Sequence, residues 1–419
     1  MPSVFKLNNT IKHFDWGSPK WIPGLLSLPN DEGKPWAELW MGVHPEGPSE
    51  LAFPAGSVSG GPRLLSGLIG QDPARYLGED VAGEFGELPF LYKLLAADQP
   101  LSIQAHPNLA QAKAGWEREN SLGIPLKAPN RNYKDANHKP EIICAITPFT
   151  AMAGFREPGE ISKRLKAFGF PRLTSLITAL ETGGDASSNT AAGEQALRRF
   201  FAALFALPAE TRQALGEYAR GRGKDASGEY AEEWKYAGRF AERYPADPAI
   251  IAPLYLNLIN LKPGEAVNIP AGILHAYVHG LGIELMANSD NVLRGGLTPK
   301  HVDPGELTGI LRFAPFKPEI LSCGENSSGL FRYPSPCREF SLYRMIGREG
   351  IAGEGAALFP LSCPAIVIVV EGKLAITTAC NGENLSLKRG ESAFIAPRKP
   401  LPVFSGDYIV FIAGTGTDL

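Results

Sequence analysis

The stretch LINLKPGEAVNIP at residues 258–270 decides the fold, because LSLKRGESAFIAP at residues 385–397 repeats its pattern. Each stretch has an apolar strand, a basic residue, a Gly-Glu turn, a second apolar strand and a proline. Two related β-barrel units would produce this repeat. The first copy continues to His275, whereas the second continues as RKPL at residues 398–401 and has no histidine. Only the first barrel is therefore expected to hold a metal through this position.

Outside these repeats, the pattern of apolar and turn-forming residues along the chain changes twice. Short apolar runs broken by Gly and Pro extend from Phe5 to about Ala153 and return after Pro248, which is typical of strands and turns. Between about Glu157 and Tyr244, apolar residues recur at helical spacing, most clearly over residues 194–207. We therefore expect a mainly β protein with a helical insertion.

Composition excludes several classes of protein. The 419 residues carry a net charge of −3, which argues against nucleic-acid and membrane-surface partners. No apolar run approaches the roughly 20 residues of a membrane-spanning helix. The first residues lack the pattern of a secretory signal, and the five cysteines include no CxxC pair. These features predict a cytoplasmic protein in a reducing compartment.

Residues 264–275 fit the pattern G-x5-P-x-G-x2-H, which resembles the second sequence motif of cupins. Cupins are small jelly-roll β-barrels in which the histidine of this motif points from a strand toward a metal. The asparagine that usually follows is replaced here by His279. Taken alone, His275 would also fit a hydrogen-bonded histidine of the core.

Two further clusters contain possible metal ligands. Gln104 and His106 are two residues apart, so on a strand both side chains would face the same side. Glu141 opens an apolar strand and shares a face with Ile143 and Ala145. A carboxylate at such a position must be paired, protonated or metal-bound, unless it is simply an exposed strand end.

Taken together, the clusters resemble one family. The segments WAELWMG, QPLSIQAHP, NHKPE, NIPAGILHAY and NSDNVLRGGLTPKH occur in this order between residues 36 and 301. This set is similar to the type I mannose-6-phosphate isomerases, which are zinc-dependent cupin enzymes. The resemblance covers roughly residues 5–302 by motif, and the C-terminal barrel by architecture more than by motif.

The resemblance implies an architecture of two cupin (jelly-roll) barrels and an α-helical domain. The expected division gives residues 1–154 and 251–320 to the catalytic barrel and residues 155–250 to the helical insertion. Residues 321–419 would form a C-terminal barrel without a metal site. The expected enzyme works as a monomer on a phosphosugar.

The resemblance also implies a reaction, the reversible conversion of mannose 6-phosphate to fructose 6-phosphate through a zinc-stabilised enediol(ate). One zinc ion per chain would be held by Gln104, His106, Glu141 and His275. Other roles follow from the matched motifs, and we list them here: Arg294 as a second cation for the enediolate; Lys139, Glu284 or Asp290 as the base; His138 in ring opening; Ser102 and Lys93 at the phosphate.

Two other functions fit the same sequence. One is another metal-dependent cupin enzyme, such as an iron oxygenase, for which the residues around Lys139 and Arg294 would have no purpose. The other is a non-catalytic cupin that binds a sugar phosphate. A metal assay distinguishes the first alternative from the zinc isomerase. A coupled isomerase assay distinguishes the second.

Overall fold

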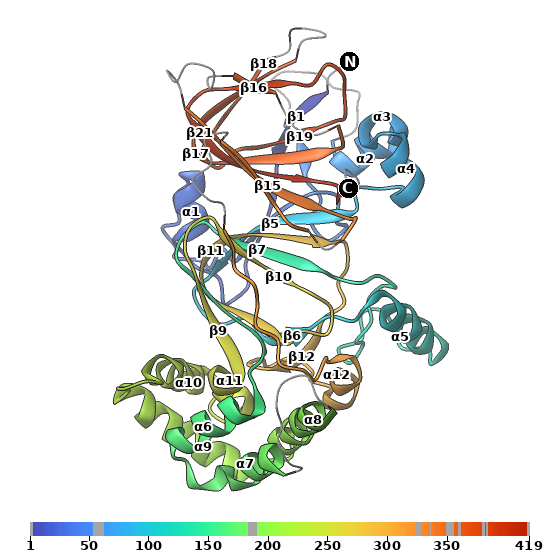
Figure 1. Cartoon of the computed structure of the whole chain (residues 1–419). Coiled ribbons are helices and arrows are strands. Elements are labelled where there is room, and N and C mark those ends of the chain that lie inside the picture. The colour runs from blue at the N-terminus through green and yellow to red at the C-terminus, as the bar shows by residue number, and fades with distance from the viewer. Residues whose placement is uncertain are drawn as a thin grey trace.

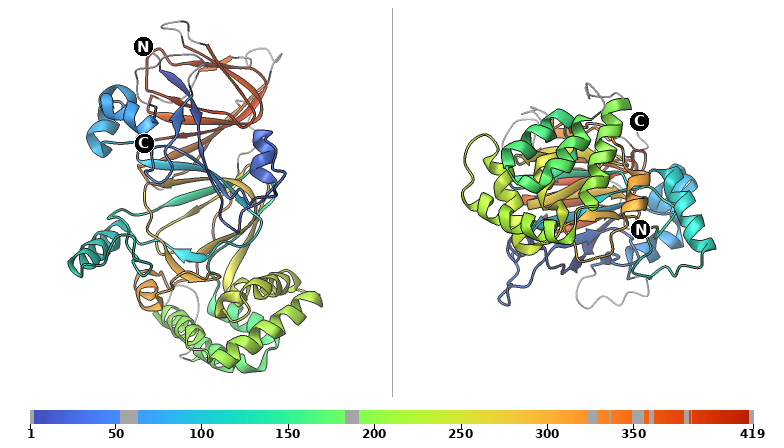
Figure 2. Two further views of the ribbon diagram at one scale, coloured as in Figure 1. Left: turned by 180° about the vertical axis from the view of Figure 1, so that it is seen from behind. Right: turned by 90° about the horizontal axis from the view of Figure 1, so that it is seen from below.

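The computed structural model describes residues 3–52, 63–182, 191–322, 329–335, 337–348, 356–358, 362–378, 382 and 384–416. Within these ranges the chain forms two antiparallel sheets, of eleven and ten strands, and a group of helices. The two sheets and the helices of residues 158–255 lie in a row, with the eleven-stranded sheet between the other sheet and these helices (Figures 1 and 2). The prediction of a sheet-rich chain with a helical insertion is confirmed.

The eleven-stranded sheet contains three of the four predicted metal ligands, and the fourth, His106, directly follows its strand β6. Its strands are β2 (Thr10–Lys12), β3 (Glu38–Met41), β5 (Phe90–Ala97), β6 (Ile103–Ala105), β7 (Glu141–Ala145), β8 (Phe149–Phe155), β9 (Leu256–Leu261), β10 (Glu265–Ile269), β11 (His275–Ala287), β12 (Leu293–Gly296) and β13 (Leu321–Ser322). The long strand β11 pairs with β5, β6, β7 and β8 along its 13 residues. It therefore joins segments that are distant in the sequence.

The ten-stranded sheet contains most of the C-terminal part of the chain. Its strands are β1 (Val4–Asn8), β4 (Glu50–Leu51), β14 (Leu330–Tyr333), β15 (Ser341–Gly347), β16 (Ala356–Leu358), β17 (Ala365–Thr377), β18 (Asn384–Lys388), β19 (Ser392–Ile395), β20 (Val403–Ser405) and β21 (Tyr408–Gly414). Its central strand β17 begins with an unbroken run of buried apolar residues, residues 365–369, of which four are β-branched. Such residues fit a strand that is covered on both faces.

Residues 4–8 and 50–51 differ from the expected division. They pair within the ten-stranded sheet, with β1 bonded to β19 on one side and to β4 on the other. The N-terminal 154 residues therefore do not all belong to the sheet that carries the metal ligands. The pairing joins Val4 to Ile395, and no local sequence pattern reports a contact at that separation.

The two repeated stretches form the same turn. In the first, the backbone N–H of Glu265 donates to the carbonyl of Lys262 at 2.9 Å, and the N–H of Lys262 donates to the Glu265 carboxylate at 2.8 Å. Glu391 and Lys388 make the equivalent bonds at 2.9 and 3.0 Å. The glycine before each glutamate has a φ near +85°, as this turn requires.

The helical insertion lies between β8 and β9. It comprises α6 (Pro158–Phe168), α7 (Thr174–Glu181), α8 (Ala191–Phe205), α9 (Ala209–Lys224), α10 (Ala231–Arg243) and α11 (Ala252–Tyr255), with short 3-10 turns at Pro171–Leu173 and Pro248–Ile251. The predicted helix over residues 194–207 is α8, which buries Leu197, Phe200, Phe201 and Leu204 at helical spacing. These side chains join a core shared with β6, β8 and β11.

Six further helices lie in the regions expected to be strands and turns: α1 (Trp21–Leu26), α2 (Leu65–Gln71), α3 (Pro73–Leu77), α4 (Glu79–Phe85), α5 (Leu109–Ser121) and α12 (Pro304–Ile310). Five of them have seven residues or fewer, which is too short for a clear helical periodicity. The exception is α5, which begins at a capping box formed by Asn108 and Gln111. In the described part of the chain, no helix has the length and apolar character needed to span a membrane.

Strand β7 separates two cores. Ile142 and Cys144 join the core between the two sheets, whereas Ile143 and Ala145 join the core inside the eleven-stranded sheet. Because side chains alternate along a strand, Glu141 lies on the same face as Ile143. The predicted orientation of Glu141 is therefore what the structure has, and it directs the carboxylate to the inside.

Candidate active site

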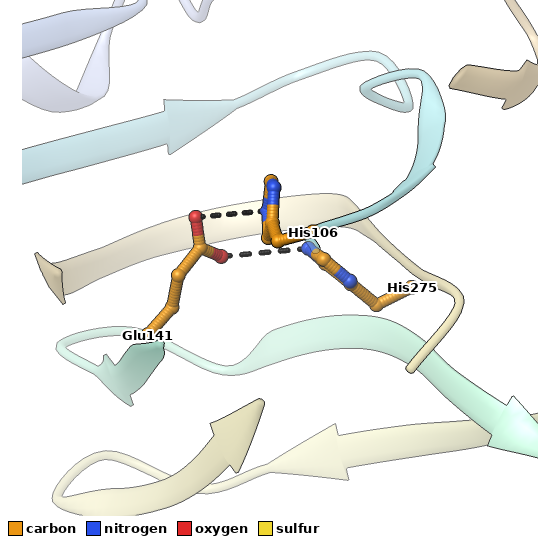
Figure 3. A group of neighbouring side chains, drawn as sticks. All are labelled: His106, Glu141 and His275. Atoms are coloured by element: carbon orange, nitrogen blue, oxygen red, sulfur yellow. Dashed lines mark ion pairs between the residues drawn. The ribbon is translucent and has the colours of Figure 1, made fainter. Parts of the chain in front are cut away.

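Three predicted metal ligands meet inside the eleven-stranded sheet (Figure 3). His106 Nε2 lies 3.2 Å from Glu141 Oε1, and His275 Nε2 lies 3.4 Å from Glu141 Oε2. One nitrogen or oxygen atom from each residue lies within 4.8 Å of the others, and all three side chains are at most 1% exposed. Such a cluster of buried donors can surround one ion.

The ends of three strands bring these side chains together. His106 follows the last residue of β6, while Glu141 and His275 are the first residues of β7 and β11. Glu141 and His275 are paired in the ladders, and the alternation of side chains along each strand directs them inward. Pro107 and Pro140 mark two of these strand ends.

Backbone carbonyls orient both imidazole rings. Nδ1 of His106 donates to the carbonyl of Asn291 at 2.7 Å, and Nδ1 of His275 donates to the carbonyl of Ile273 at 2.9 Å. A carbonyl oxygen can only accept, so each Nδ1 carries the proton and each Nε2 presents a lone pair. Among the residues that the structure describes, neither Nε2 has a hydrogen-bond partner, although both are buried.

These two orphaned nitrogen atoms fit a bound metal ion. Buried polar atoms are nearly always paired, and two imidazoles with a carboxylate are ordinary zinc ligands. Burial, together with the charge of Lys139, lowers the pKa of His106 to about 4, so the ring is neutral near pH 7. Burial alone would raise the pKa of Glu141, but Lys139 and His106 hold it well below its ordinary value. The donors are thus in the protonation states that a metal requires.

A cavity of about 270 Å³ lies beside this cluster. Six of the predicted site residues line it: Lys93, Ser102, Gln104, Lys139, Glu284 and Arg294. Lys139 connects the cavity to the cluster, because its Nζ lies 3.0 Å from Glu141 Oε1. Gln104 connects the two as well, since it lies opposite His275 in the ladder between β6 and β11.

Comparisons with known proteins agree with this arrangement. The family model for the catalytic domain of type I phosphomannose isomerase matches residues 4–158. A mannose-6-phosphate isomerase from Salmonella typhimurium is 37% identical over 93% of this chain and 94% of its own length. The corresponding protein of Macaca fascicularis is 33% identical over 94% of this chain and 93% of its own.

The chain belongs to the mannose-6-phosphate isomerase family. Solved structures extend the match to the whole fold. A crystal structure of a point variant of the Salmonella typhimurium enzyme has a TM-score of 0.87 and 34% identity, covering 99% of this chain and 100% of that one. A zinc-bound mannose 6-phosphate isomerase has a TM-score of 0.85 and 35% identity, with the same coverage. The family resemblance drawn from the motifs is confirmed.

In this family member, Lys93 lies between two carboxylates. Its Nζ is 2.8 Å from Glu284 Oε2 and 3.7 Å from Glu38 Oε1, and all three residues are buried. Burial alone would lower the pKa of Lys93, but these two carboxylates raise it above its ordinary value. Burial raises the pKa of Glu284, although Lys93 opposes this change. The charge of Lys93 is therefore compensated from within the protein.

Glu38 and Trp40 are cavity residues that the sequence did not single out. They are two apart on β3, so both face the cavity, and Trp40 Nε1 donates to Glu38 Oε2 at 2.6 Å. The signal was present in the segment WAELWMG, where a carboxylate and an indole alternate with apolar residues. Their function in the site was not evident because their partner, Lys93, lies on another strand.

Lys300 is a third cavity residue that the sequence did not single out. Like Arg294, it has no carboxylate within 4.0 Å among the described residues, unlike Lys93 and Lys139. Burial lowers the pKa of Arg294, and burial and Arg294 together lower that of Lys300. These two cations are the ones available for an anionic ligand.

Two predicted residues are not brought to the cavity. His138 is directed to the C-terminal sheet region, where its Nε2 lies 2.6 Å from Glu339 Oε1. Asp290 Oδ2 lies 3.3 Å from His44 Nε2 and its side chain is about half exposed. Neither residue lines the cavity. The geometry therefore gives no support to His138 in ring opening or to Asp290 as the base.

Proposed function

We propose that this chain catalyses the reversible isomerisation of mannose 6-phosphate to fructose 6-phosphate with one zinc ion. One observation carries the proposal: the buried cluster of His106, Glu141 and His275 adjoins a cavity with two uncompensated cations. The chain has this cluster and is 37% identical, over nearly its whole length, to a protein named for this reaction. A phosphosugar offers oxygen atoms for the metal and an anion for the cations.

We propose that His106, Glu141 and His275 hold the zinc ion and that the amide oxygen of Gln104 is the fourth ligand. Gln104 lies opposite His275 in the sheet and lines the cavity. With one carboxylate among neutral ligands, the zinc ion keeps a net positive charge and supplies Lewis-acid stabilisation of charge that develops on substrate oxygen.

The reaction moves a proton between two neighbouring carbon atoms of the open-chain sugar, so it needs a base in the cavity. We propose Glu284 for this function, because it lines the cavity and its raised pKa brings the carboxylate toward the working pH. Lys139, bound to Glu141 at 3.0 Å, remains the alternative base and otherwise serves as a proton donor near the metal ligands. Replacing each residue separately decides between them.

The cations of the cavity have different functions in the proposed reaction. Arg294 stabilises the negative charge that develops on the sugar oxygen, which is a transition-state interaction. Lys300 and Ser102 bind the phosphate, because Lys300 has no carboxylate partner among the described residues and Ser102 lines the same cavity. Lys93 holds Glu284 in place through its 2.8 Å ion pair and contributes less to the phosphate.

We further propose that each sheet forms a cupin-type barrel. The first barrel would comprise β2, β3 and β5–β13, with the helices of residues 158–255 inserted between β8 and β9. The second would comprise β1, β4 and β14–β21 and would have a structural function only. The identical turns at Glu265 and Glu391 support two related units. The five cysteines include no CxxC pair, and we propose that the enzyme acts as a monomer in a reducing compartment, the cytoplasm.

The test is an assay in which fructose 6-phosphate is measured by a coupled dehydrogenase after mannose 6-phosphate is added. Activity should be lost with a chelator and restored by zinc. Binding of the sugar phosphate without turnover would instead indicate a non-catalytic cupin. Oxygen consumption that depends on iron would indicate an oxygenase.

A further inference from the structure

Asn291 is a fully buried residue between β11 and β12. Its backbone carbonyl accepts the 2.7 Å hydrogen bond from Nδ1 of His106. This bond fixes the tautomer of the ring and keeps the lone pair of Nε2 toward Glu141. The position of one backbone oxygen thus sets the orientation of one candidate ligand.

The side chain of the same residue binds a different part of the site. Its Oδ1 accepts from the backbone N–H groups of Lys134 and Asp135 at 2.7 and 3.3 Å. Its Nδ2 donates to the carbonyls of Asp135 and Asn137, both at 2.9 Å, and to the Asp135 carboxylate at 3.1 Å. The amide therefore uses both its acceptor and its donors on residues 134–137, which lead directly to Lys139 and Glu141.

We propose that Asn291 is a positioning residue that holds His106 and the segment before Glu141 in register with each other. Its carbonyl acts on one ligand and its amide on the segment that carries another, so displacement of this one residue would move both. Arg294 follows three residues later and is set by the same segment. The proposal rests on the proposed zinc site but concerns its geometry, and no substrate enters the argument.

The experiment compares Asn291→Ala with the wild type in two measurements. The zinc Kd, measured on the metal-free protein by competition with a chromogenic chelator, should rise about 10–100-fold, the usual effect of losing a group that orients a ligand. The ring nitrogen shifts of His106, measured by NMR on metal-free protein labelled with ¹⁵N-histidine, should show the Nδ1–H form in the wild type and a mixture in the variant. Asn291→Ser serves the same purpose if the alanine variant does not fold.

The control is Asn30→Ala. Asn30 also uses its amide to bind backbone, donating to the carbonyls of Pro19 and Lys34 at 2.8 Å, but it does not line the cavity. Its loss should lower the free energy of unfolding and leave both measurements unchanged.

An unaltered tautomer and a zinc Kd within about twofold of the wild type would reduce Asn291 to a structural residue and overturn the proposal. A wild-type protein that binds no zinc would instead overturn the proposed function. The tautomer measurement on the metal-free protein would still decide the position of His106.

Discussion

Gln104 lies directly opposite Arg294 in the ladder between β6 and β12, and opposite His275 in the ladder between β6 and β11. Residues opposite each other in antiparallel strands present their side chains on the same face. The imidazole of His275, the amide of Gln104 and the guanidinium of Arg294 therefore form one row across three strands. Adjacent strands are about 4.8 Å apart, so Arg294 lies within reach of a substrate atom bound beside His275.

The first prediction concerns Arg294. If it stabilises charge that develops during the reaction, Arg294→Ala should lower kcat about 10²–10³-fold with little change in KM. Steady-state kinetics with zinc-loaded protein checks this. The matched variant is Lys300→Ala, in which the loss of a phosphate contact should raise KM and leave kcat nearly unchanged. If Arg294→Ala raises KM and Lys300→Ala lowers kcat, Arg294 binds the phosphate and Lys300 stabilises the developing charge.

The second prediction concerns Glu141. Because its two oxygen atoms face His106 and His275, Glu141→Ala removes the only carboxylate of the cluster and should reduce bound zinc from one ion per chain to a trace. Elemental analysis of dialysed protein measures this. Glu284→Gln, in the same cavity, should keep its zinc. If Glu141→Ala still binds one zinc ion per chain, Glu141 is not a zinc ligand.

The third prediction concerns Lys93. Lys93→Met leaves the buried carboxylates of Glu284 and Glu38 without their cation, so the free energy of unfolding should fall by about 3–5 kcal/mol. Urea denaturation measures the loss, and the double variant Lys93→Met/Glu284→Gln should recover part of it. If Lys93→Met has unchanged stability and a raised KM, Lys93 binds the phosphate instead of compensating the two carboxylates.

The fourth prediction concerns pH. Burial alone would raise the pKa of Glu339, but its hydrogen bond to His138 is among the interactions that hold it below the ordinary value. A lowered pKa stabilises the folded state above the ordinary carboxylate pKa of about 4.3, and this stability is lost as the pH falls through the folded-state value. Glu339→Gln should therefore cost about 1 kcal/mol near pH 7 and almost nothing near pH 3.

Denaturation of wild type and Glu339→Gln at several pH values checks the fourth prediction. The activity of the variant should stay close to that of the wild type, because the His138–Glu339 pair lies outside the cavity. If the difference in the free energy of unfolding between wild type and variant grows toward acid pH, the ionised carboxylate of Glu339 does not stabilise the folded state.

The parts of the fold and site that the sequence predicted are those with local signals. The Gly-Glu turns, the alternation that directs Glu141 inward and the periodicity of α8 each depend on residues a few positions apart. The cluster of His106, Glu141 and His275 is different, because no local rule joins residues so far apart. It was expected from the family resemblance, and the structure brings the three side chains together.

The features that the sequence missed depend on pairing between distant segments. Lys93 looked available for a phosphate until Glu284, 191 residues away, was found beside it. His138 looked like a site residue because of its neighbours in the sequence, but Glu339, 201 residues later, accounts for its position. Lys300 was missed because it follows Arg294 in a turn whose course depends on the fold.

The pairing of β1 with β19 determines when the molecule can be completed during synthesis. Val4 is made about 390 residues before its partner Ile395. At about 5–20 residues per second, the two are made about 20–80 s apart. For that time the N-terminal strand has one open edge, which is a template for wrong pairing. A chain that stops before residue 392 would keep that edge permanently, so premature termination should give aggregates, even though every candidate zinc ligand has already been made.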